Sequence, residues 1–316
     1  IQMSAFTFAR ENPDAAARYL SGLGPESVGY HDQRTILSFP GTLASAAPKE
    51  FVDFALETII EKEDPDDLYS RRRDRYGPFG AHDHLYSRAS PSLGPFLDLL
   101  DHAPAEGLRL IRALVEHATN WRRQMYRDDR QLFPRLTIHF PDGSKSFEGD
   151  CSVYHWARSI APSTVTASAL MALEAWGHKQ IESGRPFADV LHDVLGPDGS
   201  SAAFLLVGVD LVLSHWPLSS EAAWPMAATP ELLVFDDIRH PRDVTGVDRL
   251  DDGADTGRVK RADLEARPSR QSRLADTFGD YVFGNKPEQL TALRAALEQA
   301  HHEIKQGPAD ATEDAV

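Results

Sequence analysis

The sequence has a single cysteine and no long apolar run. With Cys151 as its one thiol among 316 residues, the chain can form neither an internal disulfide nor a zinc site built from several thiolates. This cysteine usage is typical of a reducing compartment, so we expect a cytoplasmic protein. The longest apolar stretch, residues 202–213, is interrupted by Asp210 and is shorter than the roughly 20 residues that a membrane helix requires. We therefore expect no membrane span.

Basic residues are in the minority. The chain has 48 acidic and 33 basic residues, which gives a formal charge of -15 at pH 7 and an average surface that repels phosphate. Binding of nucleic acid by the whole chain is therefore disfavoured, although local clusters of arginine leave it open. Hydrophobic residues make up 41% and charged residues 26% of the sequence, which is typical of a globular protein with its own core.

The common motifs of catalysis and nucleotide binding are also missing. The sequence contains no Gly-x-Ser-x-Gly nucleophile elbow and no His-Glu-x-x-His zinc motif. Residues 143–146, Gly-Ser-Lys-Ser, have part of a P-loop but lack its first glycine and fall in a predicted hairpin turn. We therefore predict no catalytic residue, no cofactor, no cofactor-binding residue and no metal ligand for this chain.

Apolar residues recur at three- and four-residue spacing along most of the chain, which predicts helices. The longest, at residues 163–183, has Gly184 placed to end it. The helix at 200–216 is apolar nearly all round, so we expect it to be buried and to form the core with the helices at 163–183 and 186–195. The predicted helices span residues 12–23, 48–63, 93–102, 104–122, 163–183, 186–195, 200–216, 220–226, 230–237, 261–278 and 286–305.

A single β-hairpin interrupts the helices. Between residues 132 and 148, Leu136, Ile138 and Phe140 alternate with polar residues, and Pro-Asp-Gly-Ser at 141–144 supplies a turn. The predicted fold class is therefore mainly α, with stacked α-α hairpins and one β-hairpin insertion. An irregular HEAT-like solenoid and an α-α bundle both fit this pattern, because no fixed repeat length is visible.

Changes in composition divide the chain into four parts. We predict a helical domain at 1–237, with the hairpin near 132–148. A flexible linker is predicted at 238–260, where the sequence is polar, rich in aspartate and without a period. A closing pair of helices follows at 261–306, and the acidic tail at 307–316 is predicted to be disordered.

A cysteine and a histidine have the spacing of a catalytic pair. Cys151 and His155 lie one helical turn apart, and a thiol nucleophile needs an imidazole nearby to form its thiolate at neutral pH. The alternative is a small buried thiol beside an aromatic helix, and we favour it because free cysteine is usually a core residue.

Histidine and acidic residues cluster at two further places. His82, Asp83 and His84 lie in a long loop predicted at 69–91, where they could contribute metal ligands. Alternate residues point apart, however, and a zinc ion would need further ligands from distant segments, so hydrogen bonding is the favoured role. His301, His302 and Glu303 are predicted to lie on a surface helix, where adjacent residues face roughly 100° apart and cannot chelate together.

Arginines are concentrated at residues 71–75, 122–130 and 258–273. Such runs can contact a nucleic-acid backbone or an acidic partner, but the aspartates and glutamates between them favour ion-paired, solvated surfaces. Trp121, Trp156 and Trp176 fall on predicted helices and are interpreted as packing residues.

Two stretches resemble a known family. The first is Ser-Pro-Ser-Leu-Gly-Pro-Phe at 90–96, leading into residues 103–108 and 114–118; the second is Pro-Ser-Thr-Val-Thr-Ala-Ser-Ala-Leu-Met-Ala-Leu-Glu-Ala-Trp at 162–176. They are similar to helical regions of large bacterial multidomain ATPase defence proteins, the STAND-like antiphage sensors, over residues 79–216. The resemblance implies a helical scaffold or sensor that binds a partner, with the ATPase motifs elsewhere in the parent protein. It transfers no functional residue.

The leading hypothesis is a non-catalytic scaffold or sensor segment of a larger bacterial defence protein. Its partner would be another protein or other domains of the same parent chain. This agrees with the first residues, Ile-Gln-Met-Ser, which show neither an initiator methionine at position 1 nor a signal peptide and suggest a fragment. One alternative is an α-α hydrolase with a His/Asp metal site that uses His82, Asp83, His84 and His117. Another is a nucleic-acid-binding module that uses the arginine runs.

Overall fold

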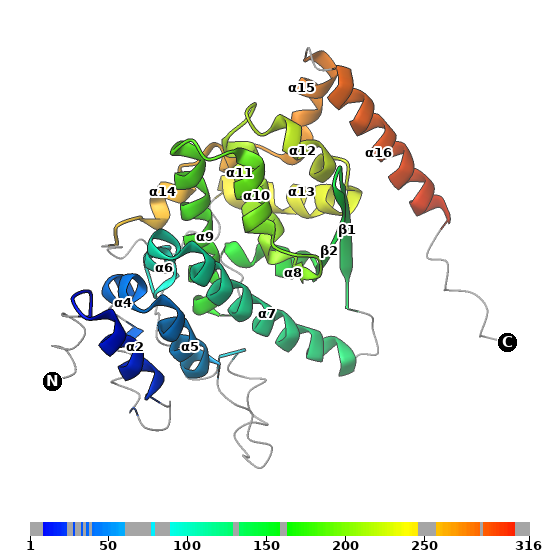
Figure 1. Cartoon of the computed structure of the whole chain (residues 1–316). Helices are drawn as coiled ribbons and strands as arrows, with labels where there is room; N and C mark the ends of the chain where they lie inside the picture. Colours follow the sequence, from blue (N-terminus) through cyan, green and yellow to red (C-terminus); the bar gives the residue numbers. More distant parts are fainter. Residues whose placement is uncertain are drawn as a thin grey trace.

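A computed structural model describes most of the chain and confirms the predicted fold class. Within the residues that it describes, the protein is mainly helical and has one small three-stranded sheet (Figure 1). The described residues are 9–23, 28, 33, 36–37, 40–60, 77–79, 89–128, 133–158, 163–245, 257–284 and 287–306.

The elements follow one another in three groups along the chain. The first contains the helices α2 (Pro13–Ser21), α4 (Pro40–Ala46), α5 (Pro48–Ile59), α6 (Phe96–His102) and α7 (Pro104–Asp128). The second contains β1 (Arg135–Phe140), β2 (Gly143–Glu148), α8 (Cys151–Tyr154), η4 (His155–Ala157), α9 (Thr164–Glu182), α10 (Phe187–Leu195), β3 (Ser200–Ser201) and α11 (Ala203–Ser214). The third contains α12 (Ser220–Ala227), α13 (Pro230–Thr245), α14 (Arg261–Glu265), η5 (Pro268–Gln271), η6 (Leu274–Asp276), α15 (Thr277–Phe283) and α16 (Pro287–Gln306).

Helices α6 and α7 pack against one another, in agreement with the predicted stacking of α-α hairpins. Pro104 begins α7, where its missing N–H costs no hydrogen bond. The two helices approach closely at Gly107, because a Cβ atom there would lie 2.8 Å from the backbone nitrogen of Leu100. Glycine at this position therefore permits the tight turn between the two helices.

Helix α9 is the centre of the fold. The Ser163 hydroxyl accepts a hydrogen bond from the Thr166 amide at 3.0 Å and caps its first turn. Its side chains are buried on all sides of the helix over most of its length, and α9 contacts α6, α7, α10, α11 and α14. A solenoid repeat contacts only its neighbours, so this arrangement is a bundle around a central helix. Helix α11, also buried all round, packs beside it, as predicted.

The predicted β-hairpin is confirmed and gains a third strand. β1 and β2 pair antiparallel, with Leu136 opposite Phe147, and the buried side chains of Leu136, Ile138 and Phe147 face the helices. β3 pairs with β2 in parallel, with Phe147 opposite Ser200. The predicted start of the helix at residue 200 was therefore wrong. Ser200 and Ser201 form β3, and α11 begins at Ala203.

Two other predicted boundaries were wrong. Helix α13 continues past residue 237 to Thr245, because Arg239 and Asp243 point into the core instead of forming part of a polar linker. The single helix predicted at 261–278 is broken into α14, η5, η6 and α15. Pro268 begins η5, and because it has no N–H to donate it interrupts the predicted helix. The division into domains and the tail at 307–316 remain predictions.

Helix α16 extends away from the body of the molecule (Figure 1). It contacts α12 and α15, and Leu293 is the side chain that it buries most fully. No described helix is long and apolar enough to cross a membrane.

Candidate functional site

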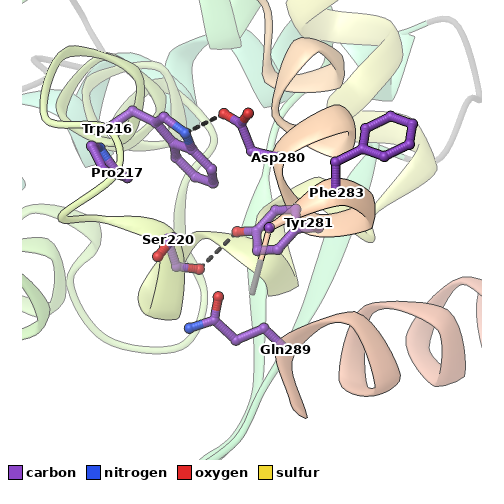
Figure 2. A pocket seen from close by; sticks show the side chains of 8 residues that line it. Trp216, Pro217, Ser220, Asp280, Tyr281, Phe283 and Gln289 are labelled. Atoms are coloured by element: carbon purple, nitrogen blue, oxygen red, sulfur yellow. Dashed lines mark hydrogen bonds between the residues drawn. The ribbon is translucent and has the colours of Figure 1, made fainter. Parts of the chain in front are cut away.

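An open pocket lies between the loop that joins α11 to α12 and the helix α15. It has a volume of about 410 Å³, and Trp216, Tyr281 and Phe283 are among the residues that line it (Figure 2). The Trp216 indole nitrogen donates a hydrogen bond to Asp280 at 2.5 Å, and the Tyr281 hydroxyl donates one to the Ser220 carbonyl at 2.7 Å. The Trp216 and Tyr281 rings meet edge to face, with 5.4 Å between their centroids. Hydrogen bonds and ring packing therefore fix both aromatic walls.

Exposed apolar residues occur in the rim of this pocket and next to its lining residues in the sequence. Phe283 is 91% exposed and Leu218, next to Pro217 in the loop, is 68% exposed. Val282 is exposed as well. Figure 2 shows the Phe283 ring directed away from the rings of Trp216 and Tyr281. Single exposed apolar residues are common on protein surfaces, but a cluster beside a pocket is typical of interaction sites.

The core contains a cluster of seven charged side chains. Arg158 donates hydrogen bonds to Glu174 at 3.1 Å and, at a shorter distance, to Asp210. Arg270 donates to the second carboxylate oxygen of Glu174 at 2.9 Å. These residues come from the end of η4, from α9, α11 and η5; Glu174, Asp210 and Arg270 are buried, and the Arg158 side chain is 12% exposed. The cluster therefore joins segments that are far apart in the sequence.

The other half of the cluster is centred on Arg239 of α13. Its Nε donates to Asp236 at 2.7 Å and its Nη1 to Asp243 at 2.8 Å. Its terminal nitrogens also donate to the backbone carbonyls of Ser269, at 2.8 Å, and Ser272, at 2.6 Å. Arg239 therefore attaches the η5 segment to α13 by side-chain and backbone contacts together.

The charges of the cluster nearly balance. It contains three arginines (Arg158, Arg239, Arg270) and four carboxylates (Glu174, Asp210, Asp236, Asp243), which leaves a formal charge of 3 - 4 = -1 when all are ionised. Burial raises the pKa of Glu174 well above its ordinary value, and it also raises the pKa of Asp210, against the opposing effect of Arg158. Most of these side chains are closed off from solvent, so the cluster is suited to holding the segments that carry it together.

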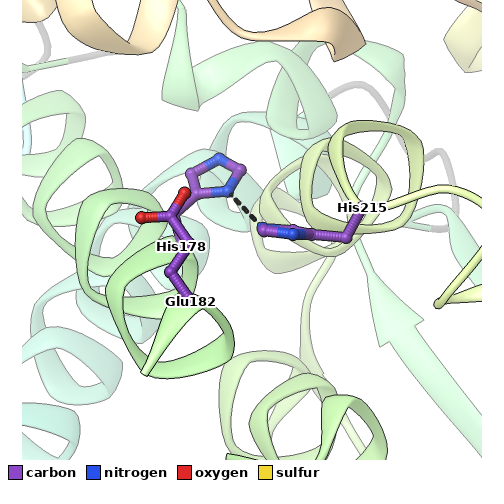
Figure 3. A group of neighbouring side chains, drawn as sticks. All are labelled: His178, Glu182 and His215. Carbon is purple, nitrogen blue, oxygen red and sulfur yellow. Dashed lines mark hydrogen bonds between the residues drawn. The ribbon is translucent and has the colours of Figure 1, made fainter. Parts of the chain in front are cut away.

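A pair of histidines lies beside this cluster. His178 on α9 and His215 at the end of α11 face one another, with 2.9 Å between Nδ1 of His178 and Nε2 of His215 (Figure 3). Glu182, one turn after His178, lies below the His178 ring and is ion-paired with Arg267. One ligand atom from each of His178, Glu182 and His215 lies within 4.8 Å of the others. These three side chains could hold a metal ion, and this group was not among the candidates found from the sequence.

The Cys151–His155 pair has the geometry of a structural contact. The sulfur lies 3.6 Å from Nδ1 of His155, but this nitrogen is 2.6 Å from the Cys151 carbonyl oxygen. Burial raises the pKa of the Cys151 thiol and lowers the pKa of His155. Both shifts oppose the thiolate–imidazolium pair that a cysteine nucleophile requires.

The other predicted histidine clusters do not come together in the described residues. His82, Asp83 and His84 lie outside the described residues. His117 is half-buried and uses Nε2 in a 2.8 Å hydrogen bond with the Pro78 carbonyl, which holds residues 77–79 against α7. His301 and His302 are exposed on α16, with 6.3 Å between their ring centroids.

The arginines of the basic runs whose side chains the structure describes are ion-paired. Arg258 binds Asp98 and Asp101, Arg267 binds Glu182, and Arg270 belongs to the buried cluster. The same holds for Arg122, which binds Asp150, and for Arg123, Arg261 and Arg273. Residues 71–75 lie outside the described part of the chain. Trp156 and Trp176 are buried packing residues, as predicted.

Sequence reasoning missed the ionic cluster, although two signals were present. Asp210 interrupts the longest apolar run, and Glu174 stands in the middle of an otherwise apolar helix. A charged residue in such a position is buried, and a buried charge needs a partner. The partners themselves were unpredictable, because they come from segments far apart in the sequence. The candidate metal site also had a signal in the sequence, because His178 and Glu182 are four residues apart and therefore share one face of a helix.

Comparison with protein-family profiles and with curated proteins found no match for this chain.

Proposed function

We propose that this chain is a helical partner-binding segment and that the pocket between Trp216 and Phe283 receives an apolar side chain of a protein partner. The observation behind the proposal is the exposure of Phe283 beside a pocket with fixed aromatic walls. Aromatic residues in such positions often dominate the binding energy of protein interfaces. Because hydrogen bonds already hold Trp216 and Tyr281, binding would require little reorganisation of the pocket.

The chemistry of the pocket suggests the kind of partner. An apolar side chain would fit against Trp216 and Tyr281, and the Asp280 carboxylate in the wall would accept a hydrogen bond from an amide or a basic group beside it. The net charge of -15 would favour the approach of a basic segment over an acidic one. We therefore propose a protein segment with a large apolar residue next to a basic one.

The resemblance of residues 79–216 to STAND-like antiphage sensors suggests a biological setting. In that setting the chain would be the scaffold or sensor part of a larger bacterial defence protein, and partner binding would be coupled to an ATPase elsewhere. Nucleic-acid binding has less support, because the arginines of residues 258–273 have carboxylate partners. A hydrolase with His82, Asp83, His84 and His117 has less support too, because His117 has a backbone partner.

A library of random peptides displayed on phage tests the proposal. Peptides selected on the full chain should contain a large apolar residue beside a basic one. Their affinity should fall about tenfold or more in Phe283→Ala and in Trp216→Ala, because one substitution removes apolar surface from the rim of the pocket and the other removes it from the wall. Val234→Ala on α13, where the side chain is 57% exposed, is the matched control and should bind as the wild type does. Peptides that bind all four proteins equally would refute the proposal.

A further inference from the structure

We propose that His178, Glu182 and His215 form a Zn²⁺ site with three protein ligands and one open coordination position. The ligand set is two imidazoles and one glutamate, which is a donor set that zinc accepts in proteins. The site is separate from the pocket at Phe283 and does not depend on the proposed function. Its three residues come from only two elements, the C-terminal half of α9 and the end of α11.

The distances fit a tetrahedral ion after a small movement. Zinc–ligand bonds of about 2.1 Å require ligand atoms that are roughly 3.4 Å apart. In the structure Nδ1 of His178 and Nε2 of His215 are 2.9 Å apart, and the three ligand atoms lie within 4.8 Å of one another. An ion between them therefore needs the two rings to separate by about half an ångström, and the Glu182 side chain can follow because it is 50% exposed.

The hydrogen bonding of His178 leaves one ring nitrogen without a partner. Its Nδ1 faces His215, whereas its buried Nε2 makes no hydrogen bond and lies 4.0 Å from the nearer carboxylate oxygen of Glu174. An unpaired buried polar atom is costly, so this arrangement needs an explanation. A zinc ion on Nδ1 would fix the ring proton on Nε2, directed at the Glu174 carboxylate. Metal-binding histidines in proteins are typically oriented by a carboxylate in this way.

A neighbouring arginine orients the carboxylate ligand. Arg267 holds one oxygen of Glu182, and the second oxygen remains for the ion, as in metal sites whose carboxylate ligands are themselves hydrogen-bonded.

Zinc titration of the full chain tests the site. After treatment with a chelator, the wild type should bind one Zn²⁺ per chain in competition with a chelating indicator. Glu182→Gln and His215→Asn should each lower the affinity about 100-fold or more, and both positions are exposed enough for the variants to fold. His302→Asn on α16 is the matched control and should bind as the wild type does. Circular dichroism of each variant verifies that its helices are intact.

Co²⁺ in place of Zn²⁺ supplies a second readout. The wild type should show the visible absorption bands of a four-coordinate cobalt site, and these should be absent in His215→Asn. Failure of the wild type to bind zinc, or equal affinity in the wild type and both variants, would overturn the proposal. A loss in His215→Asn alone would also overturn it, because Glu182 would then not be a ligand.

Discussion

Replacement of Arg239 should be one of the most destabilising single substitutions in the core. The Arg239 side chain is completely buried, and it donates to the carboxylates of Asp236 and Asp243 and to the carbonyls of Ser269 and Ser272. Methionine would replace the aliphatic part of the side chain but leave all four acceptors without this donor. Removal of one member of a buried ion pair costs about 3–5 kcal/mol, because the remaining charge is buried without its partner.

The expected loss is large beside the total stability of a domain, which is about 5–15 kcal/mol. We therefore expect Arg239→Met to lower the free energy of unfolding by at least about 3 kcal/mol, measured by urea denaturation at pH 7 with circular dichroism. Arg239→Lys should recover only part of the loss, since an ammonium group cannot reach acceptors on both sides as the planar guanidinium does. Hydrogen exchange should show faster opening of η5 and η6 in both variants.

A surface arginine is the control for this experiment. Arg273 is 44% exposed and bridges Asp276 and Asp237, so it has the same chemistry without the burial. Arg273→Met should leave the denaturation midpoint almost unchanged, because solvent and salt screen such pairs. A loss of less than about 1 kcal/mol in Arg239→Met would refute the reasoning, since it would mean that water or rearranged neighbours satisfy the four acceptors.

Four further substitutions test other contacts. Burial lowers the pKa of His155 below its ordinary value of 6.5. Its neutral ring therefore stabilises the fold above that pH, and this stabilisation is lost as the pH falls. The difference in urea denaturation midpoint between the wild type and His155→Gln should shrink from about pH 8 to about pH 5. Gly107→Ala should cost about 1–3 kcal/mol in urea denaturation, because its Cβ would meet the Leu100 backbone at 2.8 Å. Gly279→Ala in α15 has nothing within 4 Å and should instead be neutral or stabilise by up to about 1 kcal/mol; a loss there would contradict the comparison. Ser163→Ala should cost about 1 kcal/mol by removing the cap of α9, and an unchanged midpoint would mean that the cap contributes nothing.

The helices were predictable because each follows from its own residues. The apolar stripes identified α5, α7, α9 and α16, and the alternation at residues 135–140 identified β1 of the hairpin. Errors occurred where contacts between distant segments override the local pattern. The charges in residues 239–243 have the composition of a linker, yet they continue α13 because Arg239 and Asp243 find partners in the core.

The candidate sites were harder to predict than the helices. Trp216 and Phe283 come from different elements, and nothing in either sequence context indicates that they border one pocket. His178 and Glu182 are visible as a pair on one helix, but their relation to His215 depends on how α9 packs against α11. Sequence patterns describe one element at a time, whereas a site depends on the distances between elements.

The buried ionic cluster has a consequence for how sequences of this kind can diverge. Loss of Arg270 alone would leave the buried carboxylates of Glu174 and Asp210 to share a single arginine, Arg158, so such a step is costly. A joint change of the whole group to apolar residues of similar volume would be tolerated, and such replacements are sometimes even stabilising. Relatives of this chain should therefore either keep all the charged residues of the cluster or have lost them together. These positions should covary although they are far apart in the sequence; Glu174 and Arg270 are separated by 96 residues.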